Sequence, residues 1–191
     1  CGFIESAKAE AIENILEACA YKQQNPELKV IVTGCLAERY RSQIEEEIPE
    51  VDAVVGCASN KAIDSIVARL FQGENHLESY GAKKDFPLGG KRVIGTPAHY
   101  AYLKIAEGCN NRCHYCAIPG IRGPLHSRDL ADCVAEARWL AGEGVKELIV
   151  VAQDPTAYGE DWGKPGSICE LLDKLNKVPG WNGSASCTPT R

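Results

Sequence analysis

Three cysteines carry the strongest chemical signal in this sequence. Cys109, Cys113 and Cys116 lie within one stretch of eight residues, which Gly108 precedes and Pro119 follows. Because a segment bounded by glycine and proline does not continue a helix or a strand, we expect the three sulfurs to converge on a loop. Thiolates are soft ligands that bind zinc, copper(I) or iron–sulfur clusters rather than hard cations. The spacing therefore predicts one metal centre that all three cysteines share.

The number of ligands distinguishes the kinds of metal centre. A structural zinc site needs four closed ligands, and His114, which lies between two of the cysteines, is badly placed to be the fourth. An iron–sulfur cubane held by three cysteines keeps one iron open, and such an iron can bind a substrate or a cofactor. The missing fourth ligand therefore favours a functional iron–sulfur cluster, with a small zinc knuckle as the alternative.

Composition and charge argue against several other classes of protein. The chain has 191 residues and a net charge of −5, so its overall charge provides no attraction to nucleic acid phosphates. Ten cysteines are too few for a short disulfide scaffold, which favours thiols that act as metal ligands. Without a long apolar run or a basic leader, we expect a cytoplasmic protein with no membrane partner. Because the chain contains no methionine and starts at Cys1, we expect a preceding segment to be missing.

The first part of the chain alternates strands and helices. Short apolar runs at 28–33 and 51–55 predict buried strands, and apolar residues at helical spacing predict a helix before them. Such alternation predicts an open parallel sheet, in which ligands gather outside the carboxyl ends of the strands. Cys35 and Cys57 each follow one of these strand ends. Further helices are expected at 36–47 and 63–70.

The second part of the chain again alternates strands and helices, after an irregular stretch rich in glycine and proline. Strands at 100–106 and 148–152, each followed by helical periodicity, predict further βα units. Two such units cannot close a barrel, which needs about eight. We therefore expect an α/β protein with an incomplete open-sheet domain followed by the first units of a TIM-like barrel. The expected parts are a first domain at 1–73, a linker at 74–99 and a second domain at 100–191, whose tail from about 179 lacks a strand pattern.

The cysteine loop resembles a known signature. Its Cys-x3-Cys-x2-Cys spacing, with an aromatic residue before the last cysteine, is similar to that of the radical S-adenosylmethionine enzymes. The resemblance implies a 4Fe-4S cluster on Cys109, Cys113 and Cys116, whose open iron chelates the amino and carboxylate groups of S-adenosylmethionine. One electron then cleaves this cofactor to a 5′-deoxyadenosyl radical. The resemblance implies no catalytic side chain, and the residues that it implies near the cofactor are Tyr115, Gln153 and Asp154.

Longer stretches of the sequence resemble one family within this superfamily, the methylthiotransferases. The loop from Glu107 to Pro119, together with Arg122-Gly123 and Ser127-Arg128, is similar to this family. The segment that begins Thr33-Gly-Cys looks like the branch that modifies ribosomal proteins, and so do residues 152–159. The resemblance covers about residues 1–178. It implies methylthiolation of the β-carbon of an aspartate in a small-subunit ribosomal protein, with S-adenosylmethionine supplying both the radical and the methyl group.

The same resemblance implies a second 4Fe-4S cluster on three cysteines of the first domain. Cys1 and Cys35 match the second and third of these ligands, and the first would lie upstream. Cys57 matches no ligand of the family, so it is either a stray ligand or a buried thiol. A sulfur source and an electron donor are the further partners that the resemblance implies.

Two other functions stay open from the sequence. The transfer RNA branch of the family methylthiolates an adenosine derivative, but the acidic charge and the ribosomal-branch motifs favour a protein substrate. From a different class, the chain is a non-catalytic fragment that binds an iron–sulfur cluster or zinc. The amount and kind of bound metal would separate this second alternative from an enzyme.

Overall fold

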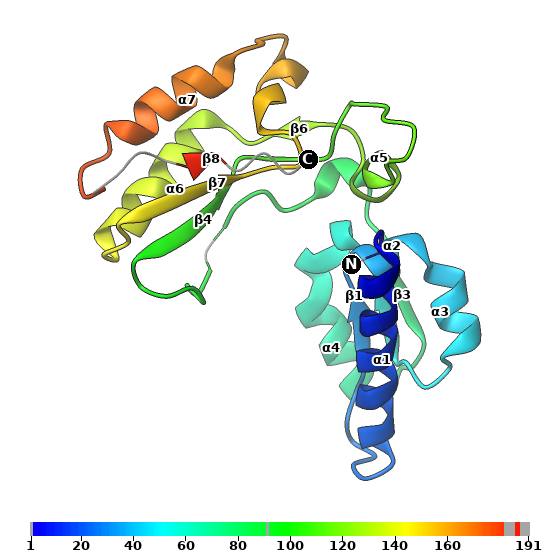
Figure 1. Ribbon diagram of the computed structural model, residues 1–191. Helices are drawn as coiled ribbons and strands as arrows, with labels where there is room; N and C mark the ends of the chain where they lie inside the picture. Colours follow the sequence, from blue (N-terminus) through cyan, green and yellow to red (C-terminus); the bar gives the residue numbers. More distant parts are fainter. Residues whose placement is uncertain (1, 91, 182–185, 188–191) are drawn as a thin grey trace. The chain divides into compact units, whose positions relative to one another are not determined.

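The chain folds into two compact units in the computed structural model, which describes residues 2–90, 92–181 and 186–187 (Figure 1). The first unit comprises Cys1–Pro87 and Gly120–Arg122, and the second comprises Leu88–Pro119 and Gly123–Arg191. Both units combine helices with a parallel sheet, so the α/β class expected from the sequence is confirmed. None of the described helices is long and apolar enough to cross a membrane.

A parallel sheet of three short strands forms the centre of the first unit. Its strands, in the spatial order β1-β2-β3, are β1 (Ile31–Thr33), β2 (Ala53–Val55) and β3 (Leu77–Ser79). The first two strands were predicted from their apolar runs. The third falls in the stretch interpreted as a linker and was missed, because Leu77 is its only large apolar residue and one residue produces no alternation.

Helices cover both faces of this sheet. The helices are α1 (Glu5–Lys22), α2 (Cys35–Arg39), α3 (Arg41–Glu47) and α4 (Ile63–Phe71), with 3-10 helices η1 (Cys57–Ala62) and η2 (Lys83–Asp85). The first three pack against Val32 and Val54, whereas α4 packs on the opposite face against Ala53 and Val55. The single helix expected at 36–47 is two helices, because Tyr40 has a non-helical backbone (φ −118°, ψ 32°).

A buried carboxylate connects α1 to this sheet. Asp52 has a side chain that is 6% exposed, and it accepts hydrogen bonds from the Val30 backbone N–H at 2.7 Å and from Lys22 Nζ at 2.8 Å. Lys29 Nζ lies 3.5 Å from its other oxygen. Burial alone raises the pKa of a carboxyl, but the hydrogen bonds from Lys22 and Val30 outweigh it and hold the pKa of Asp52 below its ordinary value. The charged form of Asp52 therefore stabilises the folded unit.

We expect Asp52→Asn to lower the free energy of unfolding at neutral pH by about 2 kcal/mol, because it removes a charged acceptor of two hydrogen bonds. Since the folded pKa is depressed, this stabilisation is complete above the unfolded pKa and is lost as the pH falls through the folded value. Urea unfolding of both proteins at neutral pH and at about pH 3 measures the effect. The difference between the proteins should shrink at acid pH, and an unchanged difference would contradict this role.

The second unit is built around another parallel sheet, in the order β4-β7-β8. Its strands are β4 (Tyr100–Lys104), β7 (Glu147–Val151) and β8 (Ser186–Cys187), and its helices are α6 (Leu130–Gly142) and α7 (Ser167–Asn176). Buried Leu103, Leu140 and Leu171 belong to one apolar core. The expected strands and helices are confirmed, and the described part of the sheet is open, as expected for an incomplete barrel.

The tail contains one departure from the sequence-based expectation. No strand was predicted after residue 179, yet Ser186–Cys187 pairs in parallel with Ile149 and Val150 of β7. The remaining residues of this tail beyond Trp181 lie outside the described part of the chain. A strand of two polar or small residues carries no apolar run, so sequence periodicity could not have indicated it.

A network of hydrogen bonds holds the segment that follows β7 against the start of α6. The segment contains η3 (Pro155–Ala157) and η4 (Glu160–Trp162). Between them, the fully buried Tyr158 donates its hydroxyl to the Arg128 carbonyl at 2.8 Å, and Gly159 N–H donates to Ser127 Oγ at 2.9 Å. Asp129 caps α6 by accepting from the backbone N–H of Ala131, which fixes the start of this helix.

Candidate metal centre

The cysteine loop begins and ends at a short antiparallel ladder in the second unit. β5 (Ala106–Glu107) pairs with β6 (His126–Ser127), and α5 (Ile118–Arg122) lies between them in the chain. Gly108 has φ +73°, and a Cβ at this position would overlap the Pro124 carbonyl oxygen. Cys109 N–H then donates to the Gly123 carbonyl at 3.1 Å. Only glycine can therefore start the loop in this conformation.

Backbone N–H groups point at two of the three sulfurs. Asn111 N–H donates to Cys109 Sγ, and Ile118 N–H donates to Cys116 Sγ, each at 3.4 Å. Such hydrogen bonds stabilise negative charge on sulfur, which a cysteine must carry when it binds a metal. Cys113 is exposed, and its carbonyl accepts from Cys116 N–H at 3.0 Å. The loop thus presents two half-buried sulfurs and one exposed sulfur on a backbone suited to thiolates.

The three cysteines share the predicted loop, but they do not form a closed site. Within the described residues, no three His, Cys, Asp or Glu side chains converge closely enough to hold a metal ion. The donor set nevertheless fits an iron–sulfur cluster, because it consists of three thiols with N–H donors to sulfur. It fits a structural zinc poorly, since that metal needs a fourth ligand. That these three residues ligate a metal stays a prediction.

Asp154 is tied directly to the cysteine loop within the second unit. It lies just after β7, and its Oδ2 accepts a hydrogen bond from Asn111 Nδ2 at 2.8 Å. Hydrogen bonds from the Thr156 side chain and then from Asn111 outweigh burial and lower the pKa of Asp154. Asp154 is therefore a charged carboxylate beside the loop. Sequence reasoning singled out Asp154 but missed Asn111, whose amide makes the connection and which no spacing rule distinguishes.

The other two residues expected near a cofactor differ in their surroundings. Gln153 is half-buried beside Asp154 at the carboxyl end of β7, where ligands of parallel sheets gather. Tyr115 is 81% exposed, so its ring is not a packing residue under the loop. The exposed ring is available to contact a bound molecule.

Cys35 lies in the first unit and is the first residue of α2. Arg122, which belongs to the same unit by its contacts, places Nη2 3.0 Å from Cys35 Sγ, and its guanidinium carbon lies 5.7 Å from the Phe86 ring centroid. The hydrogen bond from the Cys57 thiol and then the Arg122 guanidinium outweigh burial and lower the pKa of Cys35. Cys35 is thus poised as a thiolate, the form that binds a metal.

Gly2 and Cys57 are further close neighbours of Cys35. The Gly2 backbone lies so close to Cys35 that a Cβ on Gly2 would meet the Cys35 carbonyl oxygen at 2.5 Å, and Arg39 Nη1 donates to the Gly2 carbonyl at 2.8 Å. Cys1, the other ligand expected in this unit, lies outside the described residues. Cys57 is 3% exposed and packs beside Cys35, although no family pattern indicated it.

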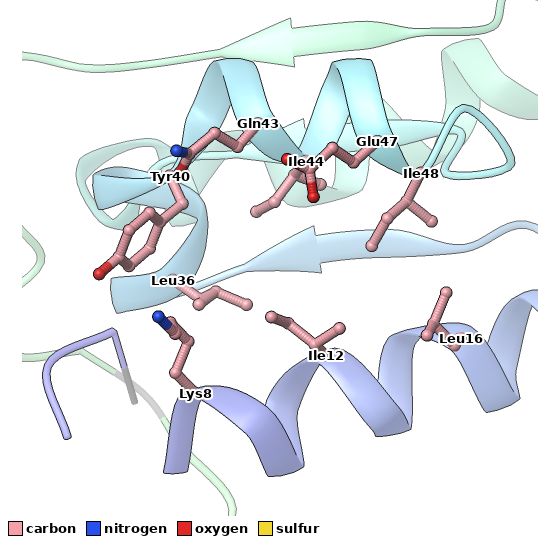
Figure 2. Close-up of a pocket in the computed structure, with 9 residues that line it drawn as sticks. All are labelled: Lys8, Ile12, Leu16, Leu36, Tyr40, Gln43, Ile44, Glu47 and Ile48. Atoms are coloured by element: carbon pink, nitrogen blue, oxygen red, sulfur yellow. The ribbon is translucent and has the colours of Figure 1, made fainter. Parts of the chain in front are cut away.

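The first unit also contains a hollow that is separate from these cysteines. A groove of about 390 Å³ opens between α1 and the α2–α3 pair (Figure 2). Ile12 and Leu16 of α1 face Ile44 and Ile48 across it. Apolar side chains dominate its walls and no cysteine lines it, so it lacks the ligands of a metal centre.

Comparison with known proteins agrees with the sequence signature. Residues 1–56 match the family described as "Uncharacterized protein family UPF0004", and residues 103–178 match the radical SAM superfamily. The chain is 45% identical to the ribosomal protein uS12 methylthiotransferase RimO of Acetivibrio thermocellus over 190 residues, which cover 94% of the chain. It is 44% identical to RimO of Clostridium tetani over 99% of the chain, and 47% identical to RimO of Sulfurihydrogenibium sp. over 94%.

The resemblance to the methylthiotransferases is confirmed. The similarity extends over nearly the whole chain, but the chain spans only 38% to 43% of the length of these three relatives. The match to the superfamily includes the cysteine loop and the segment with Asp154. The match to the first family includes Cys1 and Cys35 but ends before Cys57.

We expect Gly108→Ala to prevent the cysteine loop from forming, because the new Cβ would overlap the Pro124 carbonyl and an alanine at positive φ costs about 1 kcal/mol. Iron bound after anaerobic reconstitution should fall in this variant. Gly120→Ala is the matched control, since nothing lies within 4 Å of a Cβ at Gly120. If Gly108→Ala binds as much iron as Gly120→Ala, the strained glycine is not needed for the centre.

Proposed function

We propose that the chain is part of a radical S-adenosylmethionine enzyme that methylthiolates ribosomal protein uS12 at the β-carbon of an aspartate. The observation that carries the proposal is the loop with Cys109, Cys113 and Cys116, in a segment that matches the radical SAM superfamily. The relatives are ribosomal protein uS12 methylthiotransferases, which supports uS12 as the substrate. The choice of the aspartate β-carbon rests on the family resemblance alone.

The cysteine loop would hold the first 4Fe-4S cluster. Cys109, Cys113 and Cys116 would each bind one iron through Sγ, and the N–H groups of Asn111 and Ile118 would offset charge on two of these sulfurs. When bound, the cluster supplies one electron and an open iron to S-adenosylmethionine. Because the substrate C–H bond has no acidic proton, a radical can break it where a general base cannot.

The segment after β7 would orient S-adenosylmethionine. Asp154 is held as a carboxylate by Asn111 and Thr156, so it would attract the positively charged amino group of the cofactor's methionine part. Gln153 would add a hydrogen bond from its amide. The exposed Tyr115 ring would cover the cofactor from the loop side, which would bury an aromatic surface that is otherwise in water.

A second cluster on Cys1 and Cys35 would provide the sulfur chemistry of the product. Cys35 has the Arg122 guanidinium at 3.0 Å, which favours the thiolate form. The buried Gly2 backbone beside Cys35 supports the proposal that Cys1 takes part in the same cluster. A third ligand, a sulfur source and an electron donor would come from outside this chain. Modification of a ribosomal protein is consistent with a cytoplasmic location.

We expect the anaerobically reconstituted chain to bind about eight irons if both clusters form, and about four if only one does. Cys113→Ala removes an exposed thiol and should therefore leave the fold intact while abolishing the first cluster. Cys169→Ala, another exposed thiol in α7, is the matched control and should retain all the iron. Iron and sulfide assays with the visible spectrum measure the result. Tight zinc without absorption near about 400 nm would contradict an iron–sulfur centre.

Exchange of segments between relatives tests the substrate. We expect a RimO of Acetivibrio thermocellus in which this chain replaces the matching segment to methylthiolate uS12, as judged by mass spectrometry of the aspartate peptide. The same chimera with Cys113→Ala should be inactive. Methylthiolation of adenosine in transfer RNA, with uS12 unmodified, would instead support the transfer RNA branch. The chain alone should cleave S-adenosylmethionine to 5′-deoxyadenosine weakly or not at all.

A further inference from the structure

Cys35 and Cys57 occupy equivalent positions just beyond the ends of two neighbouring strands. In the register of the first sheet Thr33 is the partner of Val55, and each cysteine follows its strand residue by two positions. Neighbouring strands lie about 4.8 Å apart. Disulfide-bonded cysteines have Cα atoms separated by about 4.4–6.8 Å. Because both cysteines lie two residues beyond paired strand ends, the sheet brings them to the same edge, where a separation of this order is expected.

The side chains of the two cysteines also meet. Cys57, Ala58 and Phe86 form a small buried cluster against which the partly buried Cys35 packs. The backbone N–H of Cys57 donates to Glu38 Oε2 at 3.0 Å, which fixes the start of η1. Two cysteines that pack in one cluster, with the Cys57 backbone fixed by Glu38, need little movement to form a bond.

We propose that Cys35 and Cys57 form a reversible disulfide whenever Cys35 does not bind a metal. Cys57 is thereby a modification site rather than a stray cluster ligand. Formation of the disulfide does not depend on the proposed function. Its effect on the second cluster rests on the proposed function. If Cys35 is a cluster ligand, the disulfide withholds it from the cluster and protects it from irreversible oxidation until a reductant restores the thiol.

A low-molecular-weight disulfide such as oxidised glutathione can act as the two-electron oxidant that forms the Cys35–Cys57 bond. The Cys35 thiolate attacks one sulfur of this disulfide, a mixed disulfide forms, and one glutathione thiolate leaves. The Cys57 thiol then loses its proton and attacks Cys35 Sγ, which releases the second glutathione thiolate. The two cysteines are oxidised by two electrons in total, and the glutathione disulfide is reduced to two thiols. Accessible Cys35 is the site of first attack, because Cys57 is only 3% exposed.

The sequence makes the bond easy to detect. Trypsin cleavage after Lys29, Arg39, Arg41 and Lys61 separates the two cysteines into peptides 30–39 and 42–61, each with a single cysteine. The metal-free chain is treated anaerobically with oxidised glutathione, alkylated under denaturing conditions, digested and analysed by mass spectrometry. We expect the linked pair of peptides in wild type, and its complete disappearance after treatment with dithiothreitol.

Two variants and one added condition give the controls. Cys57→Ser should lose the linked pair and carry glutathione on Cys35 instead, while Cys19→Ala, which removes a buried cysteine elsewhere in the unit, should keep the pair. Reconstitution with iron and sulfide before oxidation should suppress the link if Cys35 is a ligand. Glutathione on Cys35 of the wild type without a linked pair would overturn the disulfide. A link that forms equally in the metal-free chain and in the chain that binds about eight irons would leave the bond but contradict the cluster role of Cys35.

Discussion

Negative charge on sulfur is costly to bury, and the cysteines of interest in this chain lie where that charge is offset. Backbone N–H groups of Asn111 and Ile118 donate to Cys109 and Cys116, and the Arg122 guanidinium donates to Cys35. Each of these donors is fixed by the chain that surrounds it. In the core of the second unit, by contrast, burial outweighs the nearby Arg128 charge and the Tyr158 hydroxyl and raises the pKa of Cys133. The pKa of Cys35 is lowered whereas that of Cys133 is raised, which distinguishes this proposed ligand from a packing residue.

Backbone geometry produces this arrangement at the ends of strands. The turn at Gly108 needs a positive φ and leaves no room for a side chain, so it fixes how the loop leaves β5. Parallel pairing of β4 with β7 brings Asp154 to the same edge of the sheet, where Asn111 reaches it at 2.8 Å. In the first unit, parallel pairing of β1 with β2 sets Cys35 beside Cys57. One rule, that parallel strands end at a common edge, accounts for both placements.

Much of this could be predicted from the sequence, because long apolar runs and helical periodicity identify strands and helices well. The strands at 31–33, 53–55 and 100–104 lie within the predicted runs, and the strand at 147–151 begins one residue before the run predicted at 148–152. Short strands such as β3 and β8 could not be predicted, since their pairing depends on neighbours distant in the chain. Contacts such as Asn111 with Asp154 and Arg122 with Cys35 were missed for the same reason. The Cys35–Cys57 pair is an intermediate case, because two predicted parallel strands with a cysteine two residues after each would have indicated it.

The proposed function requires that the centre on Cys109, Cys113 and Cys116 has an open iron that binds S-adenosylmethionine. Electron paramagnetic resonance of the reduced, reconstituted chain, recorded before and after S-adenosylmethionine is added, measures this binding at the cluster. We expect the cofactor to shift the cluster signal in wild type and in Cys35→Ala, and we expect no shift in Cys113→Ala. A wild-type signal that the cofactor leaves unchanged, or a shift that persists in Cys113→Ala, would contradict it.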